Sequence, residues 1–566
     1  MARPNLSICL VMSLLFLGTT STTAIGKIIY VDAHAPGANN GVSWLDAFNY
    51  LQDALAIAQS GDEIRVAQGL YTPDRGGGNR LCDREATFQL INDVTINGGY
   101  AGFDEPDPNT RDITAYETIL SGDLGINNSY HVVTGSGTDS TAVLDGFTIT
   151  GGNAIGGYTY DNGGGMYNKK GSPTLSRCTF RANSAMEGGG MHNEYNSSPI
   201  LTNCTFINNQ AEWYGGGMSN YYGSSPTLTN CAFIENYIVV WGSGGIHNDY
   251  NSSPTLTNCT FSGNYVNAWG AGIGNYKSNP VLIDCRFSAN TAGHGGGGIN
   301  NGSQSSPILI NCTFNGNLGG QGGGMRNQGS ATLIGCIFVR NSAKFYGGGM
   351  SNTNQSDPIL TNCTFSGNSA PNGNALSCNS LEQKYPSNLQ LTNCILWDGG
   401  NEIWNNDNSV ITITYSDVEG GWPGEGNINI YPYFADPNNG DFHLKSQAGR
   451  WDPNKQSWVQ DDVTSPCIDA GDISSPIGFE PFPNGNRVNM GAYGGRAQAS
   501  KSYFGSPVCT TIVAGDINGD CTVDFKDFTI MLSHWLEEKV AGDINGDCTV
   551  NFVDFAIMVS HWLEEK

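Results

Sequence analysis

Residues 188–209 read GGGMHNEYNSSPILTNCTFINN, and residues 215–236 read GGGMSNYYGSSPTLTNCAFIEN. The two stretches match position by position, so the chain contains an internal repeat. Eight copies, each about 24 to 28 residues long, align between about Gly163 and Phe365. Each copy has an apolar residue after its small residues, Asn two positions later, a turn, a Leu-Thr-Asn-Cys-Thr-Phe type run, and Phe-x-x-Asn. The first Asn of the copies are Asn168, Asn193, Asn220, Asn248, Asn275, Asn301, Asn327 and Asn352.

A repeat this short predicts a β-solenoid. One unit cannot bury its apolar side alone, but stacked units share a continuous core. Gly, Asn, Ser and Pro fill each unit, and its apolar residues alternate over short runs, which disfavours helical repeats. The run from Leu201 to Phe206 is predicted to be one short strand, and parallel crossovers favour right-handed winding. We therefore expect a mainly β fold, a right-handed parallel β-helix.

Equivalent residues of stacked coils form columns about 4.8 Å apart. In a column of Asn, each amide can donate to one neighbouring coil and accept from the other, so it satisfies itself. Disulfides are one interpretation of the Cys column, but neighbouring Cβ atoms in register are farther apart than a relaxed bridge prefers. We favour small buried thiols. The column holds Cys178, Cys204, Cys231, Cys259, Cys285, Cys312, Cys336, Cys363 and Cys394.

Both ends of the solenoid need covering, because an unpaired terminal strand invites association through its edge. Ile28 to Asp32 reads as a first strand, and Trp44 to Ala58 carries one apolar helical face. We expect that helix to cap the first coil. Strand-like runs within 411–496 are expected to close the other end.

The repeat motif resembles a known one. Gly-Gly-(Ala or Gly)-(Met, Ile or Leu) alternating with Phe-x-x-Asn is similar to the polymorphic outer-membrane protein repeat of bacterial surface passengers, within the wider pectin-lyase-like β-helix superfamily. The resemblance covers roughly residues 151–396 and implies a fold more than an activity. No outer-membrane barrel is recognised at the end of this chain, so export through its own barrel is not implied.

A second pattern begins at Gly515. Acidic and amide residues fall at positions 1, 3, 5, 9 and 12 of a loop, with Thr at position 7, and the pattern recurs 27 residues later. A hard cation such as Ca²⁺ takes six to eight oxygen ligands, and this spacing supplies them around one centre. Two in-register copies predict two Ca²⁺ sites. The predicted ligands are Asp516, Asn518, Asp520, Thr522, Asp524 and Asp527, then Asp543, Asn545, Asp547, Thr549, Asn551 and Asp554.

Each loop is followed by one apolar helical face. This duplicated loop-helix resembles the type I dockerin, which implies bound calcium and a cohesin-type partner. Position 6 is Cys521 or Cys548, where Gly is usual, and a bridge between these two stays open. Phe525-Lys526 and Phe552-Val553 depart from the usual small hydroxyl pair, so the identity of the cohesin stays open, as does an intramolecular or purely structural role.

The expected order of segments follows from these patterns. It is a signal peptide (1–24), an N-terminal cap with irregular first coils (25–150), regular repeats (151–396), last coils with a C-terminal cap (397–500), a linker (501–513) and a small α-helical dockerin (514–566).

Composition and the N-terminus indicate a secreted protein. Arg3, the apolar stretch from Ile8 to Leu17 and the small residues before Ala24 are typical of a secretory signal. No other stretch is apolar for the 18 or more residues that a membrane span needs. The chain has 26 basic against 51 acidic residues and a formal charge of −25, which excludes a nucleic-acid partner. We expect an extracellular or cell-surface location.

Outward-facing residues of the repeats are candidate ligand contacts. If Met191 and Asn193 point inward, His192 and Glu194 point outward. Flat aromatic faces and carboxylates on one side would suit a sugar chain. The alternative that we favour for the tryptophans is a structural ladder, and we expect the two histidines to be surface residues rather than ligands or bases. The candidate substrate-binding residues are His192, Trp213, Tyr221, Trp241, His247, Trp269 and Tyr276.

Glu194 and Asp249 are the candidate catalytic residues. They would lie two coils apart, roughly 9.6 Å, close to the wider carboxyl spacing of inverting glycosidases. Two hypotheses therefore stand: a non-catalytic polysaccharide-binding or cell-surface β-helix with a docking module, which we prefer, and a polysaccharide lyase or glycoside hydrolase on the same scaffold.

Overall fold

The computed structural model describes residues 26–157, 160–380 and 384–503, together with Phe528, Thr529, Met531 and Phe555. The predicted signal peptide, most of the predicted linker and nearly all of the predicted dockerin therefore lie outside the described residues. Among the residues described, no helix is long and apolar enough to cross a membrane.

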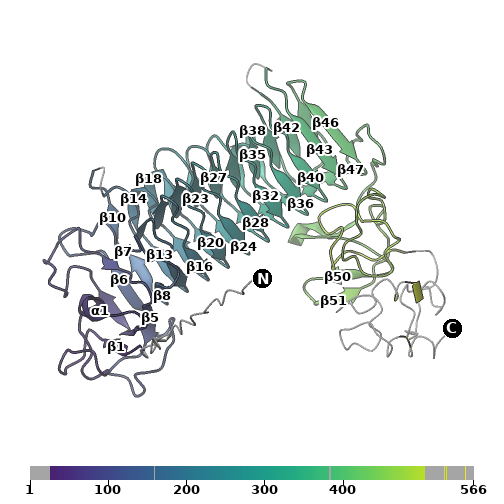
Figure 1. The fold of residues 1–566 in the computed structure, drawn as a ribbon. Helices are drawn as coiled ribbons and strands as arrows, with labels where there is room; N and C mark the ends of the chain where they lie inside the picture. Colours follow the sequence, from purple (N-terminus) through teal and green to yellow (C-terminus); the bar gives the residue numbers. More distant parts are fainter. Residues whose placement is uncertain are drawn as a thin grey trace, which may run out of the picture.

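The solenoid consists of four parallel sheets that run along its length (Figure 1). Sheet A has 14 strands, from β1 (Ile28–Val31) to β46 (Val410–Thr414), and sheet B has 13, from β3 (Gly69–Tyr71) to β47 (Asp417–Val418). Sheet C has 12, from β4 (Phe88–Gln89) to β45 (Ile403–Asn405), and sheet D has eight, from β10 (Asn153–Ala154) to β38 (Ser342–Tyr346). The predicted parallel β-helix is confirmed.

One coil shows how the repeat folds. It comprises β15 (Met191–Glu194), β16 (Ile200–Thr202), β17 (Thr205–Ile207) and β18 (Gln210–Tyr214). The run from Leu201 to Phe206 is thus split between two strands, and the prediction of a single strand was wrong. Asn203 lies at the corner with φ 54°, a left-handed conformation that Asn tolerates better than most residues.

The interior columns form as expected. Asn168, Asn193, Asn220 and Asn248 pass side-chain hydrogen bonds of 2.7–2.9 Å from coil to coil. The Phe-x-x-Asn amides form a second column, from Asn183 to Asn368. The buried phenyl rings stack at 4.5–5.0 Å between centroids. Most polar and apolar groups of the core therefore contact the same residue one coil away, although the first Asn column is interrupted between Asn275 and Asn301.

The nine cysteines of the column are buried free thiols, which confirms the prediction. Cys231 shows the usual contact, in which Sγ approaches the carbonyl oxygen of Leu201 in the preceding coil at 3.7 Å. The thiols thus act as small core residues with a weak hydrogen bond.

The N-terminal helix is shorter than expected. Helix α1 spans Leu51–Ile57, so the prediction that it starts at Trp44 was wrong. Phe48 instead continues the sheet, because its N–H donates to the Tyr30 carbonyl at 2.9 Å and its carbonyl accepts from Asp32 at 2.8 Å. Trp44 is still buried, against the rings of Tyr30 and Tyr100.

The C-terminal residues cover both the end and the flank of the solenoid. Trp422 packs with Ile403 and Ile411 against the end of the core. The pairs β48 (Phe434–Asp436) with β49 (Asp441–Leu444), and β50 (Arg450–Asp452) with β51 (Ser457–Val459), are antiparallel and follow the last coils (Figure 1). The 3₁₀ turn η2 (Pro437–Asn439) lies between β48 and β49.

Contacts with sheet B show that this segment folds back. Phe434, Phe442 and Met490 pack on Ile337 and Ile395 of sheet B. This cap therefore lies along sheet B and leaves sheet C uncovered by these contacts.

Candidate functional site

A groove crosses the outer face of sheet C. It encloses a cavity of about 490 Å³. Its floor is formed by β23 (Ile246–Asn248), β27 (Ile273–Asn275), β31 (Ile299–Asn301) and β35 (Met325–Asn327). The lining includes Trp241, His247, Asp249, Trp269, Tyr276, Asn300, Arg326 and Gln328, with Tyr214 and Tyr250. A smaller cavity of about 320 Å³ lies beside α1 and holds none of the predicted site residues.

The groove has aromatic walls. Trp241 and Trp269 lie in the loops before β23 and β27, with 54% and 39% of their surfaces exposed. Tyr250 and Tyr276, also exposed, follow the same two strands. Each of these two strands thus has an exposed aromatic side chain before and after it.

The expected tryptophan ladder does not form. Within the described residues no ring contact joins Trp213, Trp241 and Trp269. The ring contact of Trp269 is with His294, at 6.2 Å, and the guanidinium of Arg326 lies 5.1 Å from its centroid. Trp213 is exposed but does not line the groove. Trp241 and Trp269 therefore line the groove as separate side chains that do not stack on each other.

Both candidate histidines are buried, so the expectation of surface histidines was wrong. They point outward, but tyrosine rings of neighbouring coils lie against them. His192 is 1% exposed and lies between the rings of Tyr167 and Tyr221, and His247 stacks on Tyr214 at 4.5 Å. Burial lowers the pKa of each histidine to about 3, so both are neutral near pH 7.

His247 is placed to meet a ligand. Its Nδ1 lies 3.4 Å from Ser243 Oγ, and its buried Nε2 has no hydrogen-bond partner in the described structure. Gly274, the equivalent residue one coil on, has no room for a Cβ because Ser243 Oγ occupies that space. His247 therefore offers one free ring nitrogen to the groove.

The two candidate carboxylates have different surroundings. Glu194 accepts a hydrogen bond from the Tyr167 hydroxyl and pairs with Lys169 at 3.3 Å, both on the preceding coil. Asp249 lines the groove, and burial raises its pKa to about 6. Tyr221 pairs in register with Glu194 and stands in the coil between the two carboxylates. The structure brings Asp249, but not Glu194, into the groove.

Two charged residues were missed by the sequence reasoning. Glu187 is largely buried, and burial, with Asp249, Glu194 and Asp161 nearby, raises its pKa to about 7. Arg326 takes the outward position that His192, Ser219 and His247 hold in other coils. The alignment of the repeats shows this outward column, and Arg326 could have been noticed as its only arginine among the aligned copies.

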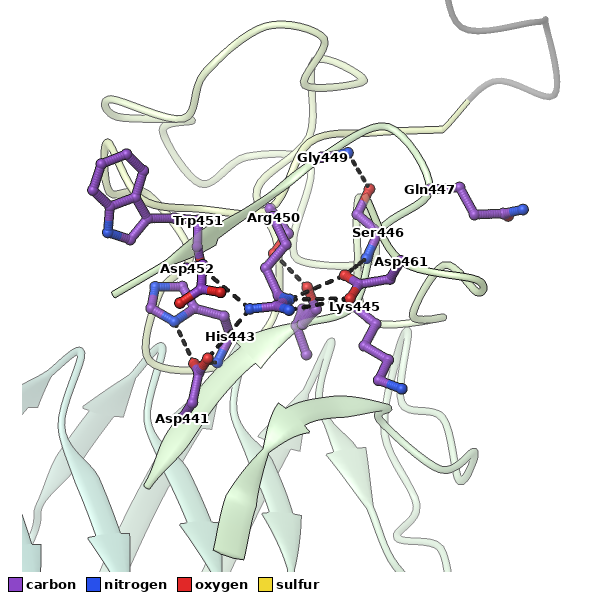
Figure 2. Close-up of polar contacts among 12 residues, drawn as sticks. Asp441, His443, Lys445, Ser446, Gln447, Gly449, Arg450, Trp451, Asp452 and Asp461 are labelled. Carbon is purple, nitrogen blue, oxygen red and sulfur yellow. Dashed lines mark hydrogen bonds and ion pairs between the residues drawn. The ribbon is translucent and has the colours of Figure 1, made fainter. Parts of the chain in front are cut away.

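A polar network holds the C-terminal cap together (Figure 2). His443 Nδ1 lies 2.6 Å from Asp441, and Arg450 bonds both Asp441, at 3.3 Å, and Asp461, at 3.0 Å. The buried His443 ring stacks on Tyr493 at 3.6 Å between centroids. These contacts join β49, β50 and the segment after β51, so the network is structural.

The predicted calcium ligands lie outside the described residues. They are Asp516, Asn518, Asp520, Thr522, Asp524, Asp527, Asp543, Asn545, Asp547, Thr549, Asn551 and Asp554, and the Cys521–Cys548 pair lies outside as well. Phe528 and Phe555, one from each copy, are in ring contact at 5.6 Å, which is consistent with two halves packing together.

Comparison with protein families identifies the solenoid. The family model described as right-handed beta helix region matches residues 118–284, 167–320 and 244–418, a continuous span over more than half of the chain. The chain belongs to the right-handed β-helix family. Within this β-helix protein, residues 397–471 match a family described as disaggregatase related, and residues 514–563 match the dockerin type I domain. It is thus a parallel β-helix with a C-terminal dockerin.

Other comparisons give distant likenesses or none. No curated protein sequence matches the chain. Among solved structures, the crystal structure of pectate lyase Pel9A is 14% identical, with a TM-score of 0.33, over 84% of this chain and 97% of that one. A rhamnogalacturonan lyase is 12% identical, with a TM-score of 0.28, over 78% of this chain and 96% of that one. Likenesses at this level do not extend to activity.

Proposed function

We propose that this β-helix is a secreted protein that binds polysaccharide in the groove of sheet C and attaches to a cohesin-type partner through its dockerin. The observation that carries the proposal is the groove itself. Exposed aromatic rings stand on both sides of a floor of amide, imidazole and carboxylate groups. Sugar rings stack on such faces, while their hydroxyls bond to such polar groups.

A matched set of tryptophan variants tests the binding site. Trp241→Ala and Trp269→Ala remove groove walls, whereas Trp213→Ala removes an equally exposed indole outside the groove. Calorimetric titration with a panel of neutral and acidic glycans should show at least a tenfold loss for the first two variants. The third should bind like the unmodified protein. Equal binding by all four proteins would refute the groove as the site.

Catalysis is the second candidate function, and it is supported by the raised pKa of Asp249. A carboxyl with a pKa of about 6 can act as a general acid near neutral pH. The proposed partner, Glu194, is engaged by Tyr167 and Lys169, and Tyr221 stands where an inverting hydrolase needs water between its carboxylates. We therefore place binding ahead of hydrolysis.

Activity assays separate the two functions. Ultraviolet detection of unsaturated ends and a reducing-sugar assay should show no turnover on glycans that bind. Turnover that is lost in Asp249→Asn and in Glu194→Gln would instead establish an enzyme and its catalytic pair.

The dockerin part of the proposal rests on the donor set in the sequence. Carboxylate, amide and carbonyl oxygens at EF-hand spacing fit a hard cation, and the twelve residues named above would hold two Ca²⁺ ions. The full chain should bind a type I cohesin panel with calcium and lose that binding with a chelator, while the β signal in circular dichroism persists. Calcium uptake without binding to any cohesin would favour an intramolecular role.

A further inference from the structure

Arg326 is a buried cation without a counter-charge. It is 9% exposed at the floor of the groove, and within the described residues it forms no ion pair. Its neighbours are neutral: Nε donates to Gln321 Oε1 at 3.1 Å, and Nη1 approaches Asn300 Oδ1 at 3.3 Å. Burial lowers its pKa to about 10, so it stays charged near pH 7. Buried charges are usually paired, and an unpaired one is costly to keep.

The surroundings of Arg326 form one end of a polarised groove. The Trp269 ring lies against the guanidinium, and Asn300 and Gln328 line the same end with amide groups. Arginine presents a fixed fork of N–H donors that matches carboxylate and sulfate oxygens. This end is therefore built to receive an anion.

The other end is mainly acidic, with Asp249 near Glu187 and the Lys277 ammonium beside Asp249. Asp249 follows β23, three coils before β35, so the two charges lie about 14 Å apart along the solenoid axis. An Asp249 carboxylate accepts hydrogen bonds from sugar hydroxyls but repels a second anion. A ligand acidic at every sugar would place a negative group against Asp249.

We propose that the groove selects a glycan of mixed charge, in which an acidic sugar binds at Arg326 and a neutral sugar binds at Asp249, between Trp241 and Tyr250. The inference rests on the proposed polysaccharide binding and adds the class of polysaccharide. The net charge of −25 works in the same direction, because it discourages binding of uniformly acidic polymers elsewhere on the surface.

The test uses oligosaccharides of equal length and different charge pattern. The mixed class is represented by hyaluronan, chondroitin and rhamnogalacturonan fragments, in which acidic and neutral sugars alternate, and the uniform class by oligogalacturonate. The same mixed fragments with their carboxyl groups reduced are the neutral arm, and carboxyl-reduced chondroitin sulfate, which carries sulfate alone, distinguishes sulfate from carboxylate. We expect at least one mixed fragment to bind tenfold or more tightly than its reduced form and than oligogalacturonate.

Two variants assign that preference to Arg326. Arg326→Gln should lose at least tenfold in affinity for the mixed glycan and leave the reduced glycan unaffected, and Arg181→Gln, an exposed arginine on sheet B, is the control. Asn300→Asp should give Arg326 an internal partner, raise the melting temperature and weaken binding of the acidic glycan. This second variant keeps the test valid if Arg326→Gln does not fold.

The outcomes separate the two levels of the proposal. Equal affinity for mixed and reduced glycans, tighter binding of oligogalacturonate, or an unchanged preference in Arg326→Gln and Asn300→Asp would overturn the mixed-charge inference and leave polysaccharide binding intact. No binding of any glycan, neutral or acidic, would overturn the proposed function itself.

Discussion

The inward and outward columns of sheet C differ sharply although they lie on the same strands. Inward, apolar residues and Asn recur in coil after coil, from Met191 and Asn193 to Met325 and Asn327. Outward, the column starting at His192 changes at each step and reaches Arg326 five coils on. An inward side chain depends on its equivalent in the next coil, so it must repeat. An outward side chain has no such constraint, so different polar and charged residues can lie next to one another on a few neighbouring coils.

Removing one inward phenyl ring should have the largest effect. Phe261 stacks between Phe233 and Phe287, and Phe261→Ala should cost about 3–5 kcal/mol of unfolding free energy through lost burial and a cavity. Urea denaturation measures it. Ser262→Ala, the outward neighbour on the same strand, should change stability by less than about 1 kcal/mol. Similar losses in both variants would erase the contrast between the two columns.

An inward amide should come next. Asn264 donates to Asn290 Oδ1 and to the Phe233 carbonyl, and it accepts from the backbone and the side chain of Asn236. Asn264→Ala leaves buried partners unsatisfied and should cost about 2–4 kcal/mol. Asn267→Ala, exposed in the same coil, is the control and should stay within about 0.5 kcal/mol. A loss no larger than that of the control would show that the amide column is dispensable.

Glu187 tests the outward side through pH. Its folded pKa of about 7 exceeds the ordinary 4.5, so the folded protein holds the proton more tightly. Its contribution to the free energy of unfolding is fully present below about pH 4.5, and it is lost as the pH rises through 7. Glu187→Gln should flatten this dependence and raise stability at pH 8 by about 2–3 kcal/mol. Thermal melts from pH 4 to 8 check it, with exposed Glu235→Gln as the control; identical pH profiles would contradict the raised pKa.

The thiol column should give the smallest change. Cys259→Ala removes one buried sulfur and one weak contact with the Leu228 carbonyl, so we expect a loss of about 1 kcal/mol. Iodoacetamide should leave the native column unlabelled and label it fully in urea. Cysteines that resist labelling in urea without reductant would indicate bridges in place of free thiols.

The inward columns could be predicted from the sequence, whereas the corners and the outward surroundings could not. The Asn, Phe and Cys columns were predictable because each residue type recurs at one place in every coil. The break at Asn203 was not, since a left-handed corner leaves the apolar pattern of Leu201 to Phe206 unchanged. The burial of His192 and His247 depends on tyrosine rings of neighbouring coils, which do not recur at the same place in every coil.

The groove was predicted in part. Trp241, His247, Asp249, Trp269 and Tyr276 line one cavity, as their shared outward face suggested. Trp213, Glu194, His192 and Tyr221 belong to neighbouring coils outside its lining. The sequence did not single out Arg326 and Glu187. What distinguishes them is burial and the charges around them, and these depend on the three-dimensional structure.

The independence of the coils has a consequence for how such a protein changes over time. Between Met191 and Asn327 each turn pairs with the turns on either side, so duplicating or deleting one unit between Asp249 and Arg326, of about 27 residues like the spacing from Asn193 to Asn220, leaves the other strand pairings undisturbed. Such an event would shift the positions of Asp249 and Arg326 relative to each other by one whole step. Gain or loss of whole coils could thus change the length of the bound sugar chain by a fixed amount each time, without a change in any single contact.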